Sequence, residues 1–94
     1  MFKMHVERDG VVRLSGRLDA SEADGAIEDL KAINGPVTLD CGDLEYISSA
    51  GLSVVLVTYK RLLAAGYDLR LVNLQPRVRN IFTYAGLNRI LQID

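Results

Sequence analysis

The sequence predicts a single α/β domain with an N-terminal hairpin, a mixed and mainly parallel β-sheet and about three to four helices. The chain has 94 residues, 49% of them apolar, a size and composition typical of one packed core. After an opening hairpin pattern, segments with strand-like and helix-like apolar periods alternate along the chain. Right-handed crossovers would place the helices over one or both faces of the sheet. One domain over residues 1–94 accounts for every segment.

The opening hairpin is predicted for residues 4–18, with its first strand reaching Arg8. Asp9 and Gly10 stand between two alternating segments, and this dipeptide suits a tight turn in which both central residues take positive φ. In the second strand, one face carries Val12, Leu14, Gly16 and Leu18. The opposite face is polar, as expected for a sheet covered on one side.

The rest of the chain alternates between helical and extended patterns. The predicted helices span residues 20–33, 50–65 and 76–86, and the predicted strands span residues 37–41, 68–74 and 89–93. Asp19 and Ser21 are candidate caps of the first helix. Gly66 is expected to end the second helix, and Pro76 suits the first position of the third. Residues 42–49 are predicted to form the loop before the second helix.

Composition narrows the classes of partner and location. Lys and Arg total 11 and Asp and Glu total 12, so nothing suggests a nucleic acid or an anionic membrane as the main partner. No apolar run approaches the roughly 20 residues of a membrane-spanning helix, so no membrane insertion is expected. The first residues lack the pattern of a secretory signal, which favours a cytoplasmic location.

The single cysteine and the single histidine argue against disulfide and metal chemistry. Cys41 has no partner for an internal disulfide and is expected to be a buried, inert thiol at the end of a strand. His5 stands alone on the first predicted strand, so no histidine cluster is available to bind a metal. We therefore expect neither a metal nor another cofactor.

A pair of serines, Ser48 and Ser49, begins the second helix within the stretch DLEYISSAGLSVVL, residues 43–56. Unpaired N–H groups and the helix dipole stabilise an anion at such a position, and the small Ala50 and Gly51 leave the serines open to another protein's active site. Those features suit a phosphorylation site. They also suit a plain N-cap, which is the commoner role of a serine before a helix, so both interpretations are open from the residues alone.

The same stretch strongly resembles the signature of the STAS domain family, the anti-sigma factor antagonists. The stretch LSGRLDASEADGAIEDL is similar to the end of the family's second strand and its first helix, and LVNLQPRVRNIFTYAGLNRIL is similar to its last strands and third helix. The resemblance covers essentially the whole chain. It implies the fold inferred above.

The resemblance also implies which residues form the site. The family's regulatory serine stands two residues before the motif glycine, which makes Ser49 the first candidate for phosphorylation and Ser48 the second. Ser48 occupies the place of a usual acidic residue. The partner-binding residues are then expected to be Asp19, Ser21, Glu22, Ser48, Ser49, Ala50, Gly51 and Ser53.

The resemblance implies that the protein is a binding switch and not an enzyme. The unphosphorylated form would bind an anti-sigma factor that is a GHKL-type serine kinase and so release the sigma factor. That kinase would phosphorylate the domain, and a PP2C-type phosphatase would reset it. An alternative is an accessory or sensing module of a transport or multi-protein signalling complex. A serine hydrolase fits poorly, because no Gly-x-Ser-x-Gly elbow surrounds Ser49 and only His5 is available as a base.

Overall fold

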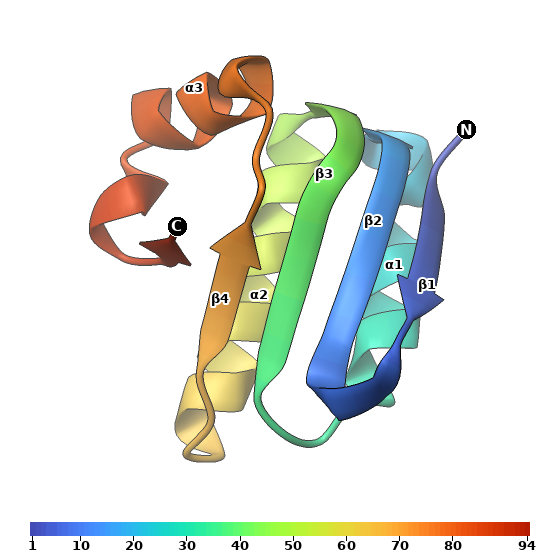
Figure 1. Ribbon diagram of the computed structural model, residues 1–94, viewed down its shortest axis with the longest axis vertical. Coiled ribbons are helices and arrows are strands. Elements are labelled where there is room, and N and C mark those ends of the chain that lie inside the picture. The colour runs from blue at the N-terminus through green and yellow to red at the C-terminus, as the bar shows by residue number, and fades with distance from the viewer.

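The computed structural model describes all 94 residues as one five-stranded sheet with three α-helices (Figure 1). The strands are β1 (Lys3–Val6), β2 (Val11–Leu18), β3 (Val37–Ile47), β4 (Leu69–Val72) and β5 (Gln92–Ile93). The helices are α1 (Ala20–Lys31), α2 (Ser49–Ala64) and α3 (Pro76–Tyr84), with short 3₁₀ turns at Arg8–Gly10 and Leu87–Arg89. The predicted α/β class is confirmed.

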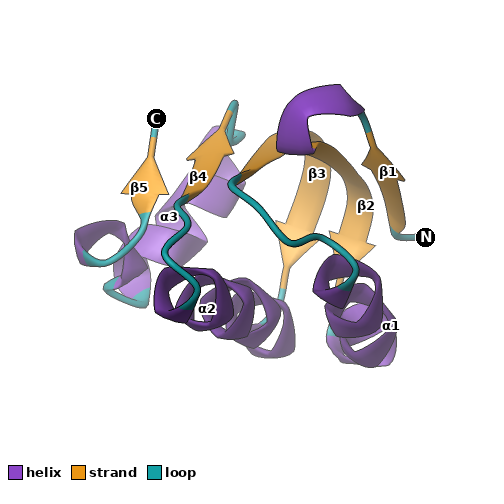
Figure 2. Cartoon of the chain, turned by 90° about the horizontal axis from the view of Figure 1, so that it is seen from below, coloured by secondary structure: helices purple, strands orange, loops and turns teal.

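The strands lie in the sheet in the order in which they occur in the chain. β1 is antiparallel to β2, whereas the pairs β2–β3, β3–β4 and β4–β5 are parallel. Each crossover leads to the next strand in the same direction, so right-handed connections place every helix on one side. All three helices indeed lie on one face of the sheet (Figure 2). The other face carries no α-helix; the short helical ribbon drawn beside β1 in Figure 2 is the 3₁₀ turn Arg8–Gly10.

The opening hairpin forms as predicted, but its loop is longer. Asp9 and Gly10 both have positive φ, 63° and 75°. β1 ends at Val6 rather than Arg8, and the Glu7 N–H closes the loop by donating to the Val11 carbonyl at 2.7 Å. Gly10 is required for a second reason, since a Cβ there would lie 2.3 Å from the Pro36 carbonyl oxygen.

The prediction of a loop over residues 42–49 was wrong, because β3 continues from Val37 to Ile47. β3 carries an extra residue at each of two bulges, between the β2 partners Arg13 and Ser15 and between Gly16 and Arg17. Bulges break the two-residue alternation from which a strand is recognised. As a result the buried residues at the end of β3 come three apart: Cys41, Leu44 and Ile47.

The ends of the helices were predicted within two residues. α1, α2 and α3 end one or two residues before the predicted limits. Gly66 follows α2 with a φ of 87°, and Pro76 is the first residue of α3. The predicted closing strand, residues 89–93, is shorter, because residues Leu87–Arg89 form a 3₁₀ turn and only Gln92–Ile93 pair with β4.

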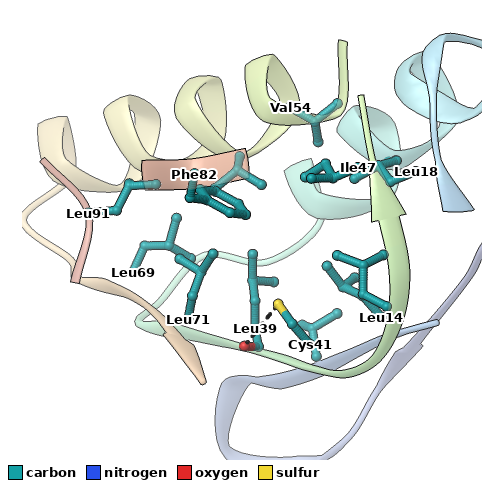
Figure 3. Packing of buried hydrophobic residues seen from close by; sticks show 14 of the residues in the cluster. Leu14, Leu18, Leu39, Cys41, Ile47, Val54, Leu69, Leu71, Phe82 and Leu91 are labelled. Atoms are coloured by element: carbon teal, nitrogen blue, oxygen red, sulfur yellow. Dashed lines mark hydrogen bonds between the residues drawn. The ribbon is translucent and has the colours of Figure 1, made fainter. Parts of the chain in front are cut away.

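The hydrophobic core fills the space between the sheet and the three helices (Figure 3). Its largest side chain is that of Phe82, which comes from α3 and is fully buried. The Cys41 thiol donates to the Leu39 carbonyl, and burial raises the pKa of this thiol to about 12. Cys41 is therefore the buried, neutral thiol that the sequence predicted.

Helices α1 and α2 are joined by an arginine side chain of α2 that donates hydrogen bonds to carbonyl groups at the C-terminal end of α1. The guanidinium of Arg61, on α2, donates to the carbonyls of Leu30 at 2.9 Å and Ile33 at 3.3 Å. The last carbonyls of a helix carry partial negative charge, so a cation stabilises them, also where a backbone N–H already donates, as the Ile33 N–H does to the Leu30 carbonyl at 3.1 Å. Arg61 thus fixes the C-terminal end of α1 against α2.

Replacing Arg61 by Met should lower the free energy of unfolding by about 1–2 kcal/mol, because two carbonyls lose a charged donor while the apolar stem is kept. Urea unfolding followed by circular dichroism measures this loss. Lys60→Met is the matched control, since Lys60 is exposed and makes no side-chain hydrogen bond. Equal losses in the two variants would contradict this role of Arg61.

The raised pKa of Cys41 predicts a loss of stability at alkaline pH. The folded protein keeps the thiol protonated, whereas the unfolded chain ionises it above about pH 9, so the unfolded state binds fewer protons. Between about pH 9 and pH 12, stability relative to Cys41→Val should fall by up to about 1.4 kcal/mol per pH unit. Parallel unfolding curves of the two proteins across this range would contradict the prediction.

Candidate functional site at the start of helix α2

Ser48 joins the end of β3 to the start of α2. Its backbone is extended, and its Oγ accepts a hydrogen bond from the Gly51 N–H at 3.2 Å, which is the N-cap geometry. The Ser48 N–H donates to the Leu18 carbonyl at 2.9 Å, one residue beyond the pair formed by Leu18 and Ile47. The half-buried Ser48 therefore attaches the start of α2 to the sheet, through its hydroxyl on the helix side and its N–H on the strand side.

Ser49 is the first residue of α2, and its surroundings differ from those of Ser48. It is exposed, and its hydroxyl makes no hydrogen bond within the protein. Its carbonyl accepts from the hydroxyl of Ser53, one turn further along the same helix and also exposed. Two serines that look equivalent in the sequence thus have different states, one capping and one free.

Gly51 is buried at the base of the site. A Cβ at this position would lie 2.6 Å from both the Ile47 Cγ1 and the Leu18 carbonyl oxygen. Only glycine lets the first turn of α2 approach the ends of β2 and β3 this closely. Gly51 therefore places the start of α2 against the sheet. The neighbouring Ala50 is half-buried, so part of its surface is accessible to a partner.

Asp19 caps α1 at the same edge of the sheet, which is the edge formed by the carboxyl ends of the parallel strands. Its Oδ1 accepts from the Ser21 N–H at 3.0 Å and from the Ser21 hydroxyl at 2.6 Å. The hydroxyl bond is the main cause of a lowered pKa for the Asp19 carboxyl, aided by the backbone bonds and the charge of Arg17. The first turn of α1 contains a second acidic residue, Glu22.

The structure brings the two predicted segments together. Because Leu18 pairs with Ile47, Asp19 and Ser48 follow adjacent ends of parallel strands, and both helices begin there. The predicted site residues Asp19–Glu22 and Ser48–Ser53 therefore adjoin one edge of the sheet.

A stacked pair beside this edge was missed by the sequence analysis. The Arg17 guanidinium lies over the Tyr46 ring, 4.4 Å from its centroid, and the two residues are register partners on β2 and β3. Stacking of this kind orients an arginine on an aromatic face. The pairing could not be read from the sequence, since it depends on both bulges of β3.

Two other findings concern residues outside this edge. No group of three His, Cys, Asp or Glu side chains is close enough to hold a metal ion, and His5 lies exposed on β1. None of the helices combines the length and the apolar character needed to cross a bilayer.

Comparison with known proteins identifies the class to which this fold and site belong. The STAS domain model matches residues 3–94, and the chain belongs to the STAS domain family. The resemblance inferred from the serine motif is thereby confirmed at the level of the family.

Two relatives align with the chain over different lengths. It is 46% identical to BtrV of Bordetella bronchiseptica over 57 residues, which are 61% of this chain and about half, 49%, of BtrV. It is 30% identical to the anti-sigma-B factor antagonist of Bacillus subtilis over 91 residues, 94% of this chain and 84% of that protein.

The solved structures of SpoIIAA, an anti-sigma factor antagonist from Bacillus, have the same fold. The unphosphorylated form has a TM-score of 0.72 at 18% identity, covering 100% of this chain and 87% of SpoIIAA. The phosphorylated form has a TM-score of 0.72 at 19% identity, covering 100% of this chain and 91% of SpoIIAA. Anti-sigma factor antagonists are thus found among both the sequence relatives and the structural neighbours of this chain.

The close approach at Gly51 predicts opposite effects for the same substitution at two helical glycines. Gly51→Ala should destabilise the protein by about 1–3 kcal/mol, because the added methyl meets Ile47 and Leu18. Gly25→Ala, in α1, should stabilise it by about 0.5–1 kcal/mol, since alanine favours a helix and nothing lies within 4 Å of the new Cβ. Thermal or urea unfolding measures both, and a stabilised Gly51→Ala variant would contradict the tight packing.

Proposed function

We propose that this protein is an anti-sigma factor antagonist whose binding to its partner is switched by phosphorylation of Ser49. The observation that carries the proposal is the difference between the two serines: the Ser48 hydroxyl caps α2, whereas the Ser49 hydroxyl is exposed and makes no hydrogen bond. A kinase can reach a free hydroxyl without first disrupting the helix start. The names of the relatives support the class of partner, an anti-sigma factor.

The electrostatics of the helix start support a phosphate at Ser49. The first turn of α2 contains no acidic residue, in contrast to α1, which has Asp19 as its cap and Glu22 in its first turn. The positive end of the α2 dipole is therefore not compensated by a nearby side chain of its own helix. A phosphoserine carries about −1.5 to −2 charges at neutral pH and is stabilised at such a position.

The same charge explains how binding would be switched off. In the unphosphorylated form, the edge presents small hydroxyl side chains, those of Ser21, Ser49 and Ser53, which a partner can cover closely. A phosphate on Ser49 would add bulk and negative charge beside Asp19. In a desolvated interface this opposes binding through repulsion and lost complementarity.

The proposed cycle needs two enzymes and assigns no catalysis to this chain. A serine kinase of the GHKL type, which is also the anti-sigma factor, phosphorylates Ser49, and a PP2C-type phosphatase removes the phosphate. The proposed location of this cycle is the cytoplasm. Ser48 is the second candidate for the modification, and its capping bond argues against it.

Phosphate transfer should separate the two serines. Ser49→Ala should abolish transfer from the kinase and leave stability nearly unchanged, because the Ser49 hydroxyl has no bond to lose. Ser48→Ala should retain most of the transfer while losing about 0.5–2 kcal/mol of stability with the cap. Phosphopeptide mass spectrometry and urea unfolding measure the two effects. Phosphate on Ser48 alone, or on neither serine, would contradict the proposal.

The partner affinity of Ser49→Asp provides a further readout of this prediction. The added negative charge should cost about 2–3 kcal/mol in the interface, so the affinity of Ser49→Asp for the partner should be roughly 30- to 150-fold weaker than that of the wild type.

Co-purification from native extract distinguishes the alternative function: a GHKL-type kinase supports the switch, whereas a membrane transporter or a multi-protein sensor indicates an accessory module.

A further inference from the structure

A hydrogen-bonded corner ties the β4–α3 connection to the middle of β3. The Asp40 Oδ1 accepts from the Gly42 N–H at 3.0 Å and from the Asn73 Nδ2 at 3.2 Å. The Gln75 Nε2 donates to the Gly42 carbonyl at 3.0 Å. The two side chains from the connection thus hold, directly or through Asp40, both backbone polar groups of Gly42.

Local backbone preference accounts for an asparagine at position 73, but not for where the side chains of Asn73 and Gln75 point. Asn73 has a φ of 62°, a left-handed conformation that asparagine adopts more readily than most residues other than glycine. Gln75 is the N-cap residue of α3, yet its side chain makes no capping bond to that helix. Both residues instead direct their amide groups to β3. Contact with β3 is the feature that explains the direction of these two amide groups.

Gly42 lies in the first bulge of β3. Arg13 pairs with Asp40, and Ser15 pairs with Asp43, so β3 holds one extra residue between these pairs. The bulge makes Cys41 and Leu44 both face the core, although they are three residues apart. A register shift by one residue would turn every later side chain of the strand to the opposite face.

The bulge also decides which serine occupies which place at the start of α2. If it were lost while the pairing of Asp40 was kept, each later residue would advance by one place along β2. Ile47 would then reach the capping position, and Ser48 would reach the exposed position now held by Ser49. The cap at Ser48 and the exposure of Ser49 therefore require that β3 keeps this extra residue, which the structure places at the bulge around Gly42.

We propose that Asn73 and Gln75 are positioning residues for the switch: by holding the bulge at Gly42 they fix the register in which β3 delivers Ser48 as the cap and Ser49 as the modified residue. They act through β3 and touch neither serine. The functional part of this inference rests on the proposed phosphorylation of Ser49, whereas the structural part does not.

The first test removes each donor and follows the serine site by NMR. Asn73→Gly permits the positive φ and removes the amide donor, and Gln75→Met keeps the length of the side chain and removes its donor. In both variants the amide resonances of Ser48 and Gly51 should shift or broaden. Phosphate transfer to Ser49 should fall by about three- to tenfold, as expected from the loss of one hydrogen bond.

Exchanging the carboxylate and the amide between positions 40 and 73 tests whether their hydrogen bond is the cause. If the single variants acted only through a general loss of stability, the exchange would not restore phosphate transfer. Asn73→Asp places a second carboxylate against Asp40 and should impair transfer further. Adding Asp40→Asn restores a donor and an acceptor in exchanged positions, and the double variant should recover most of the transfer and the resonances of the wild type. Arg70→Gln is the control: it breaks the ion pair of Arg70 with Asp94, the residue after β5, and should leave both resonances in place.

Unchanged Ser48 and Gly51 resonances in both donor-deletion variants would overturn the proposal, and so would equal shifts in Arg70→Gln or a charge swap without recovery. The NMR readout needs no partner. If the wild type takes no phosphate on Ser49, the proposed function fails, while the resonances still decide whether Asn73 and Gln75 position the site.

Discussion

The parallel pairing of β2 with β3 is the constraint on which the site depends. Both strands end at the pair Leu18–Ile47, and the chain after each of them turns into a helix. One more backbone bond, from the Ser48 N–H to the Leu18 carbonyl, extends this pairing to the first residue of the site. Two helix N-termini are thereby held side by side, with Gly51 permitting the approach of the second. Neither strand alone would create this arrangement.

The two helix starts solve the same physical problem in different ways. Each must satisfy N–H groups that have no intrahelical partner. At α1 the charged Asp19 does so, and its bonds with Ser21 hold the carboxyl ionised. At α2 the neutral Ser48 does so. The second helix start consequently keeps more of its positive potential, next to a hydroxyl that is exposed.

The features of the fold and the site that could be predicted are those determined by neighbouring residues in the sequence. Helix ends were predictable because Asp19, Gly66 and Pro76 act on their immediate neighbours, and the Asp9-Gly10 turn was predictable for the same reason. The full length of β3 was not, since its bulges exist only against β2. The distinct states of Ser48 and Ser49 likewise follow from register, which no stretch of five or ten residues encodes.

A switch of the proposed kind must alter binding without unfolding the domain, and the groups that stabilise this site do not include the Ser49 hydroxyl. Core packing at the site depends on Gly51 and Ile47, while the cap depends on Ser48; the Ser49 hydroxyl contributes to neither. A negative charge added to Ser49 would interact favourably with the α2 dipole, so the folded state would tolerate it. The penalty would fall on the interface, where a partner must exclude water from that charge. Ser49, whose hydroxyl has no structural task, is thus the residue at which the proposed modification would alter binding at little cost in stability.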